Sequence, residues 1–160
     1  MKISLENNEV CGGAFFAKKM ALATARALYR EEAGAFLLGC DEKISSKKLC
    51  GEIYEGLRLG GAYVYMLGDK ELPIASLSMV RYLCGRLEIY GIMITPSHIP
   101  CESEMRIFSP NGTELSEEKE EKIKRVYLTM PDPFGFIIPA DQRIVLCDAE
   151  AIYIKALEDV

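Results

Sequence analysis

The chain of 160 residues has room for one domain of ordinary size. Its 49% apolar and 27% charged residues are typical of a folded globular domain and argue against disorder. The 19 Lys and Arg residues are outnumbered by 24 Asp and Glu residues, so the excess of positive charge that favours nucleic-acid binding is missing. No stretch of the sequence approaches the roughly 18 consecutive apolar residues that a membrane-spanning helix needs.

The predicted secondary structure alternates between helices and short strands, which favours a layered α/β domain. Helix formers, short apolar runs, and Gly or Pro at the boundaries mark the elements. In chain order they are a helix over 14–33, a strand over 35–39, a helix from Ser45 or Ser46 to the glycines at 60–61, a strand over 62–67, a helix that starts after Pro73 and ends at Gly85, and a strand over 87–95.

The second part of the chain begins with an extended piece over 105–108 and a turn at 110–112. The charged run SEEKEEKIKR then predicts an exposed helix, because Glu precedes Lys or Arg by four residues three times. A strand over 143–147 and a last helix from Asp148 to Leu157 follow. The buried stripe of the charged helix is expected to consist of Ile123, Val126, Tyr127 and Met130.

The six cysteines show no C-x-x-C pair, and His98 is the only histidine, so the sequence has no zinc-ligand spacing. The opening residues, MKISLENNEV, contain no long apolar region of the kind that a secretory signal peptide carries. We therefore expect reduced, buried thiols in a cytoplasmic protein rather than disulfides.

Polar residues follow three of the predicted strands, and the loop after the strand over 87–95 is the most distinctive. Pro96 and Pro100 restrict the backbone at both ends of this loop, so Ser97 and His98 are expected to be held in place. A serine held at a strand end can carry a phosphoryl group; alternatively, the residues merely terminate the strand. The G-x-S-x-G motif of serine hydrolases and the phosphate-binding G-x-x-x-x-G-K-[ST] motif are both missing.

The segment GIMITPSHIP resembles the phosphoserine loop of the α-D-phosphohexomutases, G-x-M-I-T-A-S-H-N-P. Other segments resemble the family in the same order along the chain, over about residues 14–157. LLGCDEKISS is similar to V-G-x-D-x-R-x-S-S, GLRLGGAYVYMLG to G-L-x-x-x-G-x-x-V-x-x-x-G, MRIFSPNG to I-K-V-x-x-x-x-G, and IYIKAL to the linker helix before the second domain.

This resemblance implies a single-domain, three-layer α/β/α sandwich with a mixed, mainly parallel sheet over residues 1–160. Residues 148–160 are then expected to be the linker helix toward an absent second domain, and the chain is expected to be too short to form the complete enzyme. The implied function is phosphoryl transfer within hexose phosphates, by a phosphoglucomutase or phosphomannomutase that is inactive as an isolated domain. Homodimerisation of the fragment is expected, because its interdomain surface would be exposed.

The resemblance also implies the site residues. Ser97 holds the catalytic phosphate, His98 supports it, and Lys43 and Arg106 bind phosphate; alternatively, each cation is an ordinary surface charge. Mg²⁺ is expected in the full-length enzyme beside the phosphate of Ser97, with its other ligands in a later domain. The isolated chain is expected to bind no metal.

Three departures from the family pattern favour an alternative function. Ile99 stands where the loop has Asn, Glu104 brings a carboxylate that would repel phosphate unless it served a metal, and the family's opening G-T-S-G-I-R-G is not recognisable. The alternative is an inactive sugar-phosphate-binding, regulatory or structural domain that keeps the fold.

Overall fold

The structure is a computed structural model of the whole chain. It describes residues 1–6, 13–28, 35–41, 44–67, 76–96, 102–131, 143–146 and 149–159. Within these ranges, no helix combines the length and the apolar character that crossing a membrane requires.

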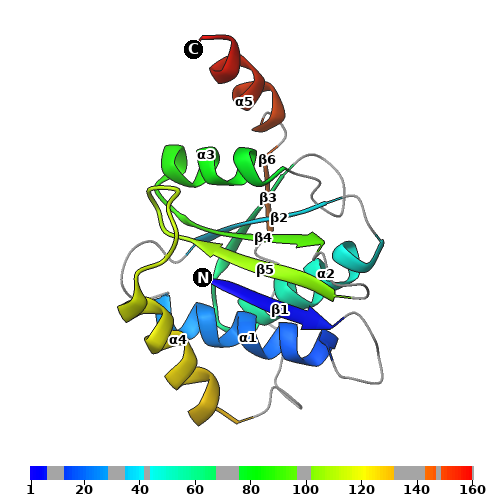
Figure 1. Cartoon of the computed structure of the whole chain (residues 1–160), viewed down its shortest axis with the longest axis vertical. Helices are drawn as coiled ribbons and strands as arrows, with labels where there is room; N and C mark the ends of the chain where they lie inside the picture. The colour runs from blue at the N-terminus through cyan, green and yellow to red at the C-terminus, as the bar shows by residue number, and fades with distance from the viewer. Residues whose placement is uncertain are drawn as a thin grey trace.

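The centre of the molecule is a six-stranded sheet in the order β1-β5-β4-β2-β3-β6. The strands β2, β3, β4 and β6 run parallel to their neighbours within this group, whereas β5 is antiparallel to both β4 and β1. The sheet is therefore mixed and mainly parallel, as predicted (Figure 1). The strands are β1 (Lys2–Glu6), β2 (Ala35–Cys40), β3 (Tyr63–Leu67), β4 (Tyr90–Pro96), β5 (Glu102–Phe108) and β6 (Arg143–Leu146).

Helices cover both faces of the sheet, which confirms the predicted three layers (Figure 1). On one face α1 (Gly13–Leu28) and α2 (Ile44–Leu59) pack against each other, and α4 (Glu117–Thr129) lies against α1. On the other face α3 (Leu77–Leu87) packs on β4 and β2. The last helix, α5 (Ala149–Glu158), contacts α3 and extends away from the sheet (Figure 1).

The alternation of side chains along the strands divides the apolar residues between two cores. Phe36 and Ile92 belong to the larger core under α1 and α2, while Leu37 and Met93 belong to the smaller core under α3. Along β5, Met105 faces the larger core. Because successive side chains of a strand point to opposite faces, the even-numbered residues of β5, which include Phe108 of the smaller core, face the α3 side of the sheet.

The helix α2 ends in the glycine pair that the sequence predicts. Gly61 has a φ of +84°, and its amide donates to the carbonyl of Arg58 while the amide of Ala62 donates to that of Leu57. These two bonds form the Schellman motif, which satisfies the last carbonyls of the helix and turns the chain toward β3. At its other end, α2 starts at Ile44, so the prediction that Ser45 or Ser46 caps it was wrong.

Other elements also differ from the prediction. The strand β1 was not predicted, β5 begins at Glu102 rather than at residue 105, and α3 continues through Gly85 to Leu87. The helix α3 ends at Glu88, which takes the left-handed conformation with a φ of 55°, and β4 starts only at Tyr90. The predicted buried stripe of α4 is confirmed, because Ile123 and Met130 are buried and the other two residues pack against the same core.

Candidate functional site

The carboxyl ends of the central strands β2 and β4 lie side by side at the same end of the sheet. Cys40, the last residue of β2, pairs with Ile94 of β4, and the amide of Asp41 donates to the Ile94 carbonyl at 3.3 Å. The chain leaves β2 toward α2 and β3, but it leaves β4 toward β5 on the opposite side. Such a change of direction marks the strand ends at which α/β domains commonly bind ligands.

Three of the four predicted site residues, Ser97, His98 and Lys43, lie outside the described residues. The described residues that precede them are Pro96, which ends β4, and Asp41, which follows β2. Both predicted loops therefore begin at the same end of the sheet, where β2 and β4 finish. The assignment of these three residues to a phosphate site stays a prediction.

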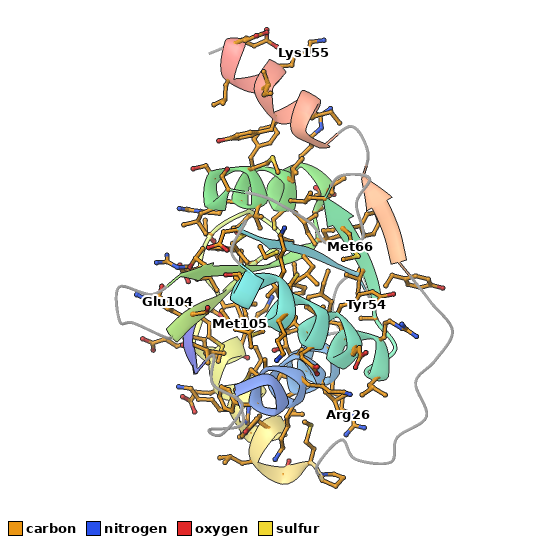
Figure 2. All side chains as sticks on the ribbon, turned by 90° about the vertical axis from the view of Figure 1, so that its right-hand side faces the viewer. Arg26, Tyr54, Met66, Glu104, Met105 and Lys155 are labelled. Atoms are coloured by element: carbon orange, nitrogen blue, oxygen red, sulfur yellow. The ribbon has the colours of Figure 1, made fainter. Side chains whose placement is uncertain are left out.

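The fourth predicted residue, Arg106, lies on β5 and faces the α3 side of the sheet. Its Nη2 donates to Oε2 of Glu104 at 3.5 Å, and Lys2 Nζ lies 3.1 Å from Oε1 of the same carboxylate. The Glu104 side chain is only 8% exposed, compared with 28% for Arg106 and 51% for Lys2. Figure 2 labels Glu104 on β5, the neighbour of β1. We call Lys2, Glu104 and Arg106 the β1–β5 charge cluster.

The β1–β5 charge cluster changes the expected role of Glu104. The sequence suggested that its carboxylate would repel a phosphate or serve a metal, but in the structure two cations neutralise it. The Cα partner of Glu104 on β4 is Thr95, two residues before Ser97 in the sequence. Within the β1–β5 charge cluster the carboxylate is therefore neutralised, since Lys2 and Arg106 contribute two positive charges against one negative charge.

Lys2 is the member of the cluster that sequence reasoning missed. It lies directly opposite Arg106 in the ladder between β1 and β5. The available signal was the alternation of polar and apolar residues in KISLE, which is typical of a half-buried strand. Because this signal spans only five residues, it is weak without the partner strand.

Removing the carboxylate of Glu104 is expected to destabilise the fold. In Glu104→Gln the two cations face each other without a counter-charge, so the free energy of unfolding should fall by about 1–2 kcal/mol, less than for a fully buried pair because both cations are partly exposed. The matched control is Glu121→Gln, whose 64% exposed side chain pairs with Lys124; its effect should stay within about 0.5 kcal/mol. Urea denaturation measures both, and equal effects would show that the cluster contributes no stability.

The described residues offer no site for a metal ion. They contain no group of three or more His, Cys, Asp or Glu side chains that could hold one. The carboxylate of Glu104 already interacts with Lys2 and Arg106, so it does not fit the role of a metal ligand. The phosphate of Ser97, the one metal ligand predicted for this chain, lies outside the described residues.

Three cysteines are free thiols in the core. The thiol of Cys50 on α2 donates a hydrogen bond to Cys40, which lowers the pKa of Cys40 and raises that of Cys50. Burial raises the pKa of Cys84 to about 12, so this thiol stays protonated and unreactive near neutral pH. The expectation that the cysteines are buried is confirmed for these three residues; the other cysteines, Cys11, Cys101 and Cys147, lie outside the described residues.

Comparison of the sequence with models of known protein families identifies the family of this chain. Residues 8–132 match the family model of phosphoglucomutase/phosphomannomutase, alpha/beta/alpha domain I. The chain belongs to this family. The prediction made from the GIMITPSHIP loop and its surrounding segments is therefore confirmed at the level of the family and its first domain.

Curated relatives of this mutase domain carry the name phosphoglucosamine mutase. That of Mesorhizobium japonicum is 35% identical over 105 residues, which are 62% of this chain and 22% of the relative. That of Bacillus subtilis is 32% identical over 111 residues, which are 68% of this chain and 24% of the relative. The chain thus spans less than a quarter of the length of these relatives.

Solved structures show the same fold at low sequence identity. A candidate phosphomannomutase from Thermus thermophilus has a TM-score of 0.72 at 19% identity, covering 91% of this chain and 32% of its own. A phosphoglucomutase/phosphomannomutase family protein from Burkholderia thailandensis has a TM-score of 0.68 at 15% identity, covering 99% of this chain and 34% of its own. These likenesses support the fold of the mutase domain and not its activity.

Proposed function

We propose that this chain is the phosphoserine-bearing domain of a phosphohexomutase, an enzyme that moves a phosphoryl group within a hexose phosphate. The observation that carries the proposal is the position of β4. This strand carries the sequence GIMITP to the end of the sheet at which β2 also finishes, and Ser97 is the next residue after it. Family membership supports the same conclusion, because the matched model covers this strand and loop.

In the proposed cycle, Ser97 carries a phosphoryl group and gives it to a free hydroxyl of a hexose monophosphate. The bond from phosphorus to Ser97 Oγ breaks as the bond to the sugar oxygen forms, and the hydroxyl proton ends on Oγ. The resulting bisphosphate turns over, and its other phosphoryl group returns to Ser97. Catalysis of such a transfer depends mainly on positioning and on neutralising charge.

Arg106 and Lys43 are the proposed phosphate-binding cations, and His98 is the proposed support for Ser97. Arg106 suits this role because it lies on β5 opposite Met93 of β4, faces the α3 side of the sheet and retains guanidinium N–H groups beyond the one used by Glu104. When bound, Mg²⁺ supplies further neutralisation of the oxygens of the transferring group.

The proposed first substrate is a glucosamine phosphate, since the curated relatives are phosphoglucosamine mutases. The test is an assay of the full-length natural protein with glucosamine 6-phosphate, and in parallel with glucose and mannose phosphates, each with Mg²⁺ and a hexose bisphosphate activator. Because the chain spans less than a quarter of those relatives, the isolated chain should show no turnover. Conversion of glucosamine, glucose or mannose phosphate supports the mutase function, and conversion of none of them contradicts it.

The second candidate function is an inactive domain that binds a sugar phosphate or regulates another protein. Ile99 favours it, because an apolar residue replaces the family's Asn in the phosphoserine loop. Under this alternative, the full-length protein binds hexose phosphates without isomerising them.

We also propose that the protein is located in the cytoplasm, where thiols such as Cys84 stay reduced.

The helix α5 is the proposed linker toward a following domain. Its residues Ile154 and Leu157 are 48% and 57% exposed, although both are large and apolar. In the isolated chain we expect this face to pair with a second copy, so light scattering should give the mass of a dimer. The double variant Ile154→Lys/Leu157→Lys should be monomeric, whereas Leu128→Lys on α4, 79% exposed, should stay dimeric. A monomeric unmodified chain would contradict the expectation.

A further inference from the structure

The turn that follows β5 contains Asn111-Gly112, the only place in the chain where a glycine follows an asparagine. In such a pair the backbone nitrogen of the glycine can attack Cγ of the asparagine, because glycine has no Cβ to hinder the approach. Asn111 is exposed to solvent, so water can take part in the reaction. The turn is therefore a candidate site of covalent modification, and the proposed mutase function makes no use of it.

The reaction is a deamidation that consumes only water. The Gly112 nitrogen loses its proton and bonds to Cγ of Asn111, and the side-chain nitrogen takes up a proton and leaves as ammonia. Water then opens the resulting cyclic imide at either carbonyl group. One opening leaves an aspartate, and the other leaves an isoaspartate, in which the main chain runs through Cβ and Cγ of the former side chain.

The backbone of the turn keeps the attacking nitrogen away from Cγ. The amide of Gly112 donates to the carbonyl of Ser109 at 2.9 Å, and Asn111 has a negative φ, so the sequence SPNG forms a type I β-turn. The third residue of this turn has a ψ of about 0°. The Gly112 nitrogen then lies beside the backbone nitrogen of Asn111, whereas the attack requires it beside Cβ. The turn has to open before the imide can form.

Gly112 is also fixed against α3, which opposes this opening. Its φ is +81°, and a Cβ on it would lie 2.5 Å from the carbonyl oxygen of Arg81. The Nε of Arg81 in turn donates to the carbonyl of Gly112 at 3.0 Å. Rotating the peptide group between Asn111 and Gly112 therefore disturbs contacts on both sides of the glycine.

The side chain of Asn111 is held in the same arrangement by its neighbours. The amide and the hydroxyl of Thr113 donate to its Oδ1 at 3.1 and 2.6 Å, and the hydroxyl of Ser109 also bonds to this oxygen. These bonds depend on the closed turn. Each of them consequently stabilises the unreactive conformation.

We propose that Asn111 is a latent deamidation site and that the closed turn, with the hydroxyl of Thr113 as one of its restraints, keeps it unreacted in the folded domain. An isoaspartate at this position would lengthen the main chain inside the turn. Gly112 could then not keep its bonds to both Ser109 and Arg81. The restraint thereby protects the packing of the turn on α3.

The test measures the rate of deamidation of the chain in mildly alkaline buffer, by chromatography and mass spectrometry of the peptide that contains residue 111. Thr113→Val keeps the shape of the side chain and removes one hydrogen bond, so the rate should rise about two- to tenfold. Thr113→Ser keeps the hydroxyl and should keep the rate. The matched control is Thr129→Val on α4, whose exposed hydroxyl donates to the Arg125 carbonyl at 2.8 Å. Its rate should stay within about twofold of that of the unmodified chain.

Unfolding the chain in urea removes all of these restraints and should give a faster reaction than any folded variant. The proposal is overturned if the folded and the unfolded chain react at the same rate, or if Thr113→Val reacts like Thr129→Val. A slower reaction of Thr113→Val would overturn it too, because the hydroxyl would then promote the attack by polarising the side-chain carbonyl. Equal urea midpoints of the folded variants show that a change in rate does not come from loss of folding. Since no substrate and no part of the Ser97 loop takes part, the outcome is independent of the mutase assay.

Discussion

Replacing Gly56 by alanine is expected to destabilise the fold by about 1–3 kcal/mol. Gly56 lies on α2 where this helix crosses α1, and a Cβ there would come within 2.3 Å of the backbone oxygen of Lys18 and 2.8 Å of the Ala21 Cβ. Because the nearest atom belongs to the backbone of α1, it cannot move aside as a flexible side chain can. The two helices would have to separate, and the buried residues between them, such as Leu22 and Leu57, would lose packing.

The control for this prediction lies about one and a half turns earlier on the same helix. A Cβ at Gly51 would meet no atom within 4 Å. Gly51→Ala should therefore stabilise the fold by up to about 1 kcal/mol, because alanine favours the helix over glycine. Urea denaturation of the two variants should give shifts of opposite sign. A stabilising effect of Gly56→Ala would mean that α1 and α2 are not as close as the structure places them.

Replacing Ser97 by alanine is expected to lower the mutase activity of the full-length protein by about 10³-fold or more, because the residue that accepts and returns the phosphoryl group is removed. Thermal stability should hardly change, since only a hydroxyl group in a loop is lost. The activity is measured with glucosamine 6-phosphate under the conditions of the proposed assay. This variant produces the largest effect that the proposed function predicts.

An exposed serine elsewhere in the domain provides the comparison for Ser97. Ser78 lies on the solvent side of α3, and Ser78→Ala should keep the activity within about twofold of the unmodified enzyme. If Ser97→Ala also kept its activity, the phosphoryl group would have to be carried by another residue. The family membership of the domain would then still hold, but the proposed role of its loop would not.

The local pattern of the sequence was sufficient to predict most of the sheet. The apolar runs at 35–39 and 62–67 correspond to β2 and β3, because buried parallel strands need apolar side chains on both faces. The strand β1 was missed for the opposite reason. Its few residues become a strand only by pairing with β5, which lies far away in the sequence, and no local feature of the sequence shows that pairing.

The end of α3 shows how packing can override a local signal. Glycine is a common residue at a helix end, so Gly85 was expected to terminate α3. In the structure the helix continues to Leu87, and Gly85 lies inside it against the loop around Asn111, whose carbonyl oxygen would be 3.4 Å from a Cβ. The turn is formed instead by Glu88, and the amide of Ile89 donates to the carbonyl of Cys84.

The candidate site was predictable in part. The loop that contains Ser97 has a motif long enough to recognise, and the strand before it reaches the expected sheet edge. The ion pair of Lys2 with Glu104 was not predictable, because it depends on the register that places Lys2 opposite Arg106. Likewise, the neutralisation of Glu104 is a property of the folded sheet, since Lys2 is distant from it in the sequence.

The most direct test of the proposed function is to locate the phosphate by mass spectrometry of peptides from the full-length natural protein after incubation with glucose 1,6-bisphosphate. The account predicts a phosphoryl group on Ser97 that disappears when the protein is then given a hexose monophosphate. An unmodified Ser97, or a phosphoryl group found only on another residue, would contradict it.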